Sequence, residues 1–290
     1  MHLKFIAASL AAAIIAGPAI AADRLPVKAL PARVPPAVFS WTGFYVGANL
    51  GAGWDTSGTQ SGSQFYTGTF GPPGPTTAWT NSMSSPRGLL GGLQAGYNWQ
   101  FSPWLVAGLE TDIQRASIHG DGAVATAVTV GTNGIAAHNG AIALAQKTDW
   151  FGTLRARVGV TPFAAPVLFY ATGGLAYGSA KTSFAMADTF PINGAIIAGA
   201  AAGSATRTGW TVGGGAEWAI TPNWSFKGEY LHVDLGGSLL GAVNNVLVTG
   251  PAPFPIFVEN QSYRTSFDVV RVGVNYRFGS VSPLEALARN

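Results

Sequence analysis

Apolar and polar residues alternate in the last strand-length stretch of the chain, residues 263–278. Every second residue from Val270 to Phe278 is apolar, and the residues between them include Arg271 and Arg277. A period of two predicts an extended strand with one apolar and one polar face. Full charges on the polar face and aromatic residues at the end fit a transmembrane strand, with its apolar side toward lipid and its polar side toward a small lumen.

The same alternation recurs along the chain and predicts eight strands. They are residues 41–54, 88–100, 104–113, 147–160, 167–179, 207–220, 224–235 and 263–278. Short turns near residues 102, 163 and 222 alternate with long inserts without a sustained period, at 55–85, 117–145, 182–205 and 236–261. Bacterial barrels share this alternation of periplasmic turns and external loops. We therefore predict an all-β fold, an eight-stranded antiparallel up-and-down transmembrane β-barrel with long external loops. The facing of strand 167–179 stays open.

An eight-stranded barrel is only wide enough inside to hold side chains. The predicted inward positions hold nine charged residues, which are Glu110, Asp112, Arg155, Arg157, Glu217, Lys227, Glu229, Arg271 and Arg277. If the two strands that meet at the Pro222 turn pair symmetrically, Glu217 lies opposite Lys227. Glu110 and Arg155 lie at similar heights above the short turns on adjacent strands, which predicts a second pair. Unpaired buried charges are costly, so we predict a salt-bridge network. Such a network can plug the lumen or form an ion-selective constriction, and the narrow lumen favours the plug.

Aromatic residues gather beside the predicted short turns and at the end of the last strand. They are Trp99, Trp104, Trp218, Trp224, Tyr276 and Phe278. Transmembrane barrels carry such girdles at both membrane interfaces. Trp54, Trp150 and Trp210 lie near the long inserts and are candidates for the second girdle.

The composition supports this interpretation. Only 10% of the 290 residues are charged, against roughly 25% in ordinary soluble domains. Outside the first twenty residues, no apolar run reaches the length of about 20 residues that a membrane helix needs. The net charge of +3 is scattered, so nucleic-acid binding is not expected. The chain has no cysteine, which excludes disulfides and thiolate chemistry, and no motif for a cofactor or a metal.

The two ends of the chain differ from the barrel region. Residues 1–21 have a short basic start, an apolar core and an A-x-A ending, which predict a signal peptide cleaved between Ala21 and Ala22. Residues 22–40 are rich in proline and predict an extended periplasmic tether. The barrel is expected over residues 41–278, followed by a periplasmic tail at 279–290.

Several strands resemble those of the small alphaproteobacterial outer-membrane β-barrel family, also described as porin-like or surface-antigen proteins. The similar segments are FSWTGFYVGANLGAGW (39–54), GGLQAGYNWQ (91–100), LFYATGGLAYG (168–178), GWTVGGGAEWAI (209–220) and VVRVGVNYRF (269–278). The resemblance implies an OmpA-like barrel in the outer membrane. It also implies that the barrel-insertion machinery reads the terminal strand, although twelve residues follow Phe278 here.

Four hypotheses about function remain at this point. The first is a structural or surface barrel without enzymatic activity, in contact with outer-membrane lipid. The second is a narrow channel for small solutes. The third is a loop-borne binder of haemin or of a host surface, as some members of the resembling family are linked to these roles. It would use exposed aromatics such as Phe65, Tyr66 and Trp79, but no haemin motif is present. The fourth is an enzyme with His232 and Asp234 at the outer rim, which lacks a nucleophile.

Overall fold

The computed structural model describes residues 39–278 with some gaps, and for some outer strand segments it describes the backbone only. The gaps are residues 57–58, 67–73, 83–86, 129–137, 163–165, 191–194, 245 and 250–256. The signal peptide with Ala21 and Ala22, most of the proline-rich tether and the tail at 279–290 lie outside the described residues. The described chain has no helix that is long and apolar enough to span a membrane.

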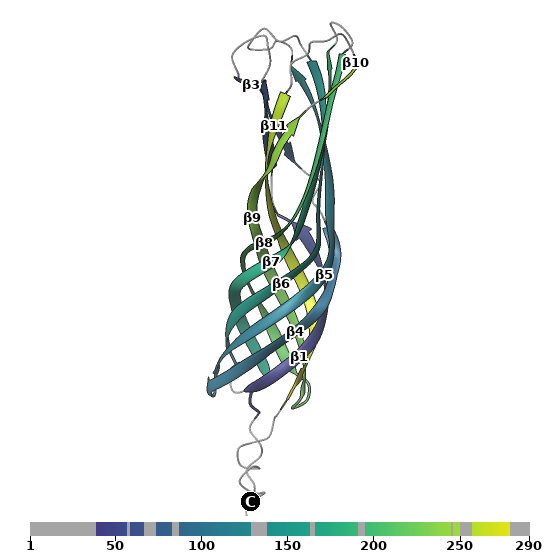
Figure 1. Ribbon diagram of the computed structural model, residues 1–290. Coiled ribbons are helices and arrows are strands. Elements are labelled where there is room, and N and C mark those ends of the chain that lie inside the picture. The colour runs from purple at the N-terminus through teal and green to yellow at the C-terminus, as the bar shows by residue number, and fades with distance from the viewer. Residues whose placement is uncertain are drawn as a thin grey trace, which may run out of the picture. The chain divides into compact units, whose positions relative to one another are not determined.

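Eight strands form a closed ring in sequence order (Figure 1). They are β1 (Gly43–Asp55), β4 (Arg87–Ser102), β5 (Leu105–Val128), β6 (His138–Val160), β7 (Val167–Phe190), β8 (Ala195–Ala219), β9 (Trp224–Asn244) and β11 (Phe257–Arg277). Each strand is antiparallel to its neighbours, and β11 closes the ring against β1, with Val274 opposite Ala48. The predicted eight-stranded up-and-down barrel is therefore confirmed.

The two faces of the strands follow the period of two in the sequence. Leu50 is 71% exposed and Leu93 is 65% exposed, whereas their neighbours Asn49 and Gln94 are buried inside the ring. On β7, where the sequence left the facing open, Leu168 and Tyr170 point inward and Phe169 points outward. The ring thus exposes apolar side chains and encloses polar ones, the reverse of a soluble barrel.

The exposed apolar side chains form a belt of the height that a bilayer requires. On β1 the outward side chains of the belt run from the exposed Phe44 to the half-buried Trp54, ten residues apart. This distance is about 33 Å along a strand at about 3.3 Å per residue. A tilt of roughly 40° reduces it to about 25 Å in height, which is the usual apolar band of an outer-membrane barrel.

The long inserts are not loops throughout, contrary to the prediction. Strands β5 to β9 and β11 continue beyond the belt, so residues 117–128 and 182–190 are strand rather than loop. The first insert forms a hairpin of β2 (Thr59–Tyr66) and β3 (Gly74–Ser82), and β2 pairs with β11. A short strand, β10 (Val246–Thr249), pairs with β8. We call the part of the barrel beyond the belt the outer extension.

Polarity inverts where the belt gives way to the outer extension. Trp54 is paired with Arg87, Trp150 with Arg115 and Trp210 with Asp234, so each tryptophan lies level with a charged residue. Beyond them large apolar side chains appear at inward positions, beside polar ones such as Thr182 and Asp188. The apolar ones are Ile142, Leu144, Phe184 and Met186, which are buried in one cluster with Tyr263. The outward positions become small or polar, because alanine, serine and lysine replace leucine and valine there.

A charge placed in the belt should destabilise the barrel, whereas the same charge in the outer extension should not. Leu50→Lys is expected to lower the free energy of unfolding by about 2–4 kcal/mol, because the ammonium group would lie near the centre of the bilayer. Ala143→Lys, on an outward position of the outer extension, is the matched control and should change it by less than about 0.5 kcal/mol. Denaturant unfolding from lipid vesicles measures both. Equal losses would place the membrane boundary elsewhere.

Candidate functional site: the lumen

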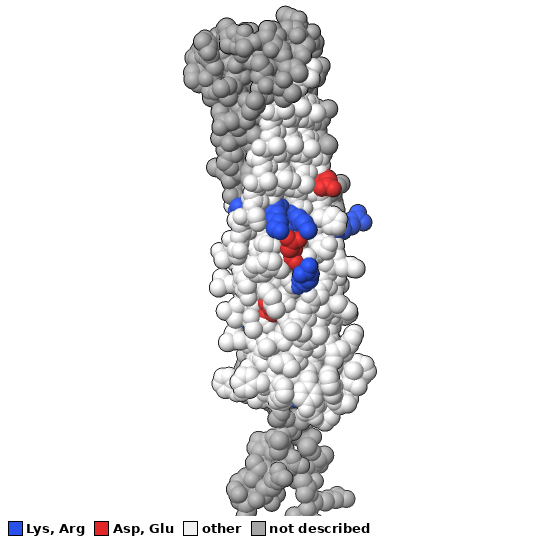
Figure 2. Space-filling model, turned by 45° about the vertical axis from the view of Figure 1, so that its right-hand side comes forward, with Lys and Arg blue, Asp and Glu red and all other residues white. Residues whose placement is uncertain are grey.

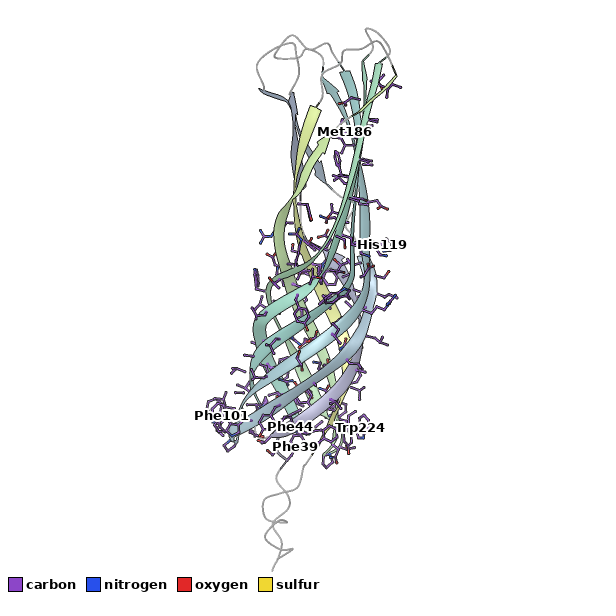
Figure 3. All side chains as sticks on the ribbon, viewed as in Figure 1. Phe39, Phe44, Phe101, His119, Met186 and Trp224 are labelled. Carbon is purple, nitrogen blue, oxygen red and sulfur yellow. The ribbon has the colours of Figure 1, made fainter. Side chains whose placement is uncertain are left out.

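The lumen is filled by three layers of side chains, and the first closes the end with the short turns. Trp41, Val106, Leu168, Tyr170 and Ala219 are buried together there. Phe39 stacks edge-on against Trp41 at 5.2 Å. Figure 3 shows Phe39, Phe44, Phe101 and Trp224 at this end and Met186 near the other.

The second layer is an ion-pair network centred on Glu110. This carboxylate is buried and accepts a charged hydrogen bond from Arg155, its register partner on β6. Lys227 Nζ lies 2.9 Å from Glu110 Oε1, and Arg157 Nη1 lies 3.3 Å from Glu110 Oε2. This carboxylate is therefore shared by two cations from the adjacent β6 and one from β9 across the lumen, and Arg271 Nη2 lies farther away, at 3.7 Å from Glu110 Oε1.

Arg271 and Arg155 join the remaining acids to this centre. Arg271 donates to Asp112 Oδ2 at 2.9 Å and, through Nε, to Glu229 Oε2 at 2.7 Å. Arg155 reaches the same two acids, each at 3.0 Å. The two guanidinium groups and the two carboxylates thus form a closed set in which each cation contacts both anions.

Glu217 forms the branch nearest to the short turns. It lies opposite Lys227, so the predicted register is confirmed, as is that of Glu110 with Arg155. Its ion-pair partner is nevertheless Arg157, at 2.8 Å, because the Lys227 ammonium reaches across the lumen to Glu110.

The charges of this layer balance. Four carboxylates, on Glu110, Asp112, Glu217 and Glu229, meet four cations, on Arg155, Arg157, Lys227 and Arg271. All eight side chains are at most 4% exposed. A buried charge without a partner would cost several kcal/mol, so this balance lets the layer exist in a narrow lumen.

Arg277 does not take part in the network, although the sequence placed it there. It points inward but donates to the backbone oxygens of Ser40 and Pro222, at 3.1 Å and 3.0 Å. Its guanidinium lies 4.9 Å from the ring of Trp41. The reason is its position at the end of β11, where the lumen opens toward the turns and the nearest groups are carbonyls and aromatic rings.

Two tyrosines belong to the network but were not predicted as part of it. Tyr45 donates to Glu110 Oε2 at 2.6 Å, and Tyr170 donates to Glu229 Oε1 at 3.0 Å. Their rings occupy space beside Gly96 and Gly215, where an added Cβ would collide with the tyrosine hydroxyls. The inward parity of Tyr45, opposite a glycine on the next strand, was the signal in the sequence.

A third, apolar layer lies on the opposite side of the network from the short turns. Its members are buried and come from β4 to β7, β9 and β11. They are Leu90, Ala116, Ile118, Phe151, Ala176, Leu231, Val233, Leu235, Phe267 and Val269. Phe151 and Phe267 meet edge-on across the lumen, with ring centroids 5.1 Å apart. The sequence analysis did not identify this layer.

The predicted girdle residues lie on the outer surface. Trp99, Trp104, Trp218, Trp224 and Phe278 are exposed, whereas Tyr276 is half-buried. The ring of Tyr276 lies 5.0 Å from that of Trp224 and 5.1 Å from that of Phe278. Aromatic contacts therefore tie β9 to β11 beside the short turns.

Exposed charges concentrate at the start of the outer extension. On the face drawn in Figure 2, most visible charged side chains gather there, and the surface toward the short turns is nearly uncharged. Asp149 forms ion pairs with Lys181, at 2.7 Å, and with Lys147, at 2.9 Å. These hydrogen bonds, with Lys181 the stronger influence, hold the pKa of the Asp149 carboxyl below its ordinary value.

The two residues of the rim-enzyme hypothesis, His232 and Asp234, bind different partners. His232 Nδ1 contacts Asp268 Oδ1 at 2.6 Å, whereas Asp234 is buried and is bound by Arg264 and by the backbone N–H of Gly236. The difference arises because Asp234 lies where β9 separates from β8, and its carboxylate turns toward the N–H of the bend. Within the described part of the chain, no group of three or more His, Asp or Glu side chains could hold a metal ion.

Comparisons with known proteins found a matching family model and several similar proteins. A family model described as "Outer membrane protein beta-barrel domain" matches residues 9–278. The 31 kDa outer-membrane immunogenic protein of Brucella melitensis is 34% identical over 279 residues, covering 95% of this chain and all of that protein. A 22 kDa outer membrane protein of Rhizobium leguminosarum bv. viciae is 31% identical over 67% of this chain and 64% of its own length. The crystal structure of OprG from Pseudomonas aeruginosa is 12% identical, with a TM-score of 0.40 over 81% of this chain and 97% of that one.

Removal of the central carboxylate should destabilise the barrel strongly. Glu110→Gln keeps the size of the side chain but leaves four buried cations facing three carboxylates. The expected loss is about 3–5 kcal/mol in the free energy of unfolding, measured in lipid vesicles. The double variant Glu110→Gln with Lys227→Met restores the charge balance and should recover part of that loss. Equal stability of Glu110→Gln and the wild type would show that the network carries no net energy.

Proposed function

The chain belongs to the outer membrane protein β-barrel family, and from this premise we propose that it is a structural, surface-exposed protein whose lumen is plugged by the charged network. It is an outer-membrane protein, and its belt sits in the membrane. The charge-balanced layer around Glu110 carries the proposal. Its eight buried charges leave the barrel interior occupied at mid-height, where a channel would need continuous water.

The layers on either side of the network support the same conclusion. Phe151 and Phe267 meet across the lumen on one side, and Trp41 closes it on the other. An eight-stranded barrel has an interior that side chains alone can fill. Three successive packed layers therefore favour the plug over the alternative of a narrow channel for small solutes.

A role at the cell surface fits the relatives. The Brucella proteins are named as immunogenic outer-membrane proteins, which suggests a non-enzymatic surface role for this chain. His232 contacts Asp268 rather than Asp234, the partner that the rim-enzyme hypothesis required, so this contact gives that hypothesis no support. The aromatics Phe65, Tyr66 and Trp79, which motivated a binder of haemin or a host surface, have side chains outside the described set.

The orientation follows from the connections between strands. Short turns are periplasmic and long loops external in bacterial barrels, so we place the outer extension outside the cell. In this orientation both ends of the chain lie on the periplasmic side. These ends are the predicted signal peptide at 1–21, the tether at 22–40 and the tail at 279–290. Phe278, directly after the end of β11, is the position at which the insertion machinery is expected to engage the chain.

The plug predicts that the refolded wild-type protein forms no conducting pore. Planar bilayer recordings should show no conductance steps. The variant with Glu110→Ala, Arg155→Ala, Phe151→Ala and Trp41→Ala removes one balanced ion pair and part of both apolar layers, and it should conduct. Steps of equal size in the wild type and the variant would refute the plug and favour the channel.

The orientation is testable because the chain contains no cysteine. Ser183→Cys, exposed on the outer extension, should react with a membrane-impermeant maleimide on intact cells. Thr221→Cys, exposed at a short turn, is the matched control and should react only after the outer membrane is permeabilised. The reverse labelling pattern would show that the barrel is inserted the other way.

A further inference from the structure

Basic side chains line up across four neighbouring strands where the belt meets the outer extension. We call them the basic row, and they are Arg87 on β4, His119 on β5, Lys147 on β6 and Lys181 on β7. In the registers of these strands, each member is the direct partner of the next. All four side chains are exposed on the outer face. Neighbouring strands are about 4.8 Å apart, so the row extends roughly 14 Å around the barrel.

The basic row needs anions, because like charges directly opposite each other on adjacent strands destabilise a sheet. Asp149 supplies one anion, since its carboxylate holds the ammonium groups of Lys181 and Lys147 side by side, at 2.7 Å and 2.9 Å. The two lysine side chains nevertheless remain about half exposed, at 50% and 54%. One carboxylate between two ammonium groups leaves one positive charge uncompensated at this point.

Two exposed arginines add to this excess of positive charge. Arg87 begins the basic row, and Arg115 lies four residues before His119 on β5. Neither guanidinium forms an ion pair with any residue that the structure describes. The nearest exposed acid along β5 is Asp121, so four Lys and Arg charges on this part of the surface meet the carboxylates of Asp121 and Asp149. Figure 2 shows blue side chains gathered around red ones at this end of the belt.

The charges on the other side of the ring are paired at this height. On β9 and β11, Arg264 pairs with Asp234, and His232 contacts Asp268. On β8 the register partner of Lys181 is Ser204, so the basic row ends at β7. The excess of positive charge therefore lies on the side of the barrel formed by β4 to β7.

An apolar surface lies directly beneath the basic row. Leu89, two residues after Arg87 on β4, is 75% exposed, and Ile113, two residues before Arg115 on β5, is 47% exposed. The rings of Trp150 and Tyr177 meet edge-on beside them, with centroids 6.2 Å apart. Tryptophan and tyrosine lie at the level of the lipid headgroups in membrane proteins. The basic row thus lies at headgroup level, above a surface that acyl chains can cover.

We propose that the basic row and Arg115 bind the phosphate groups of a glycolipid in the outer leaflet, with its acyl chains on Leu89 and Ile113. Guanidinium groups donate paired hydrogen bonds to phosphate oxygens, and lysines and arginines at a membrane surface strengthen the binding of anionic lipid. A row of this length can contact more than one phosphate of the same headgroup. The choice of leaflet rests on the proposed orientation, which places the outer extension outside the cell. The lipid would be held at β4 to β7 rather than evenly around the barrel.

The test uses the mature full-length protein in neutral detergent micelles and native mass spectrometry, which counts the lipid molecules that stay bound. One probe is bisphosphorylated lipid A, and the matched probe is the same lipid after removal of both phosphates. The phosphorylated probe should reach half-saturation at a concentration about tenfold lower than the dephosphorylated one. Inorganic phosphate should not displace it at an equal concentration, because a free phosphate lacks the acyl chains.

Variants separate a local site from the net charge of the protein. Arg87→Gln combined with Arg115→Gln should raise the half-saturating concentration of the phosphorylated probe about tenfold and leave that of the dephosphorylated probe unchanged. Arg87→Lys with Arg115→Lys keeps both charges and should retain most of the affinity. The matched control, Arg24→Gln with Lys28→Gln, removes two positive charges from the predicted tether and should change neither value. Heat-modifiable gel migration establishes that each variant is folded.

Four outcomes would overturn the proposal. They are equal binding of the two probes, unchanged binding by the folded glutamine variant at Arg87 and Arg115, equal weakening by the tether control, and displacement by inorganic phosphate at an equal concentration. The third would assign the binding to net charge, and the fourth to a free anion. Micelles have no sidedness and the assay requires no closed lumen, so none of these outcomes bears on the orientation or the plug, which cysteine labelling and conductance test separately.

Discussion

The structure depends on the balance of charge inside a narrow ring of strands. A barrel in lipid must pair all of its backbone polar groups within the sheet, and closure of β11 onto β1 does so. With eight strands, the space left inside is filled by side chains, so any charge placed there must find its partner among them. The sharing of Glu110 by Arg155, Arg157 and Lys227 is the solution adopted here. This arrangement links strands from opposite sides of the ring through one carboxylate. The nearby tyrosines donate hydrogen bonds to the acids, and glycines leave room for the tyrosine rings.

Much of the ring could be predicted from the sequence, because a period of two has only two possible facings. Arg155 and Glu110 had to point inward once Leu109 and Leu154 pointed outward, and the short turn at Pro222 determined which residues meet across β8 and β9. Ion-pair partners were harder to predict than facings. A lysine is long enough to bypass its register partner, as Lys227 does, and an arginine at a strand end can be satisfied by carbonyls, as Arg277 is. Periodicity contains no information on either choice.

The outer extension escaped prediction for a different reason. Its strands carry alanine, glycine, serine and threonine on both faces, so the contrast between neighbouring positions is low. The few strong signals there, such as Leu144 and Phe184, point inward and therefore contradict the belt pattern. A pattern that inverts halfway along a strand averages out in any single window. The outer extension would have been found by comparing the two halves of each strand separately, with a tryptophan taken as the boundary between them.

The inversion of polarity has a consequence for how the protein sits in its bilayer. If the barrel moved outward by a few residues, leucines of the belt would enter water. If it moved inward, lysines and Asp149 would enter hydrocarbon. The rigid ring cannot shorten itself, and tilting would submerge one side of the charged zone while lifting the other. Depth is therefore an intrinsic property of this molecule, and a membrane of unsuitable thickness has to stretch or thin around it.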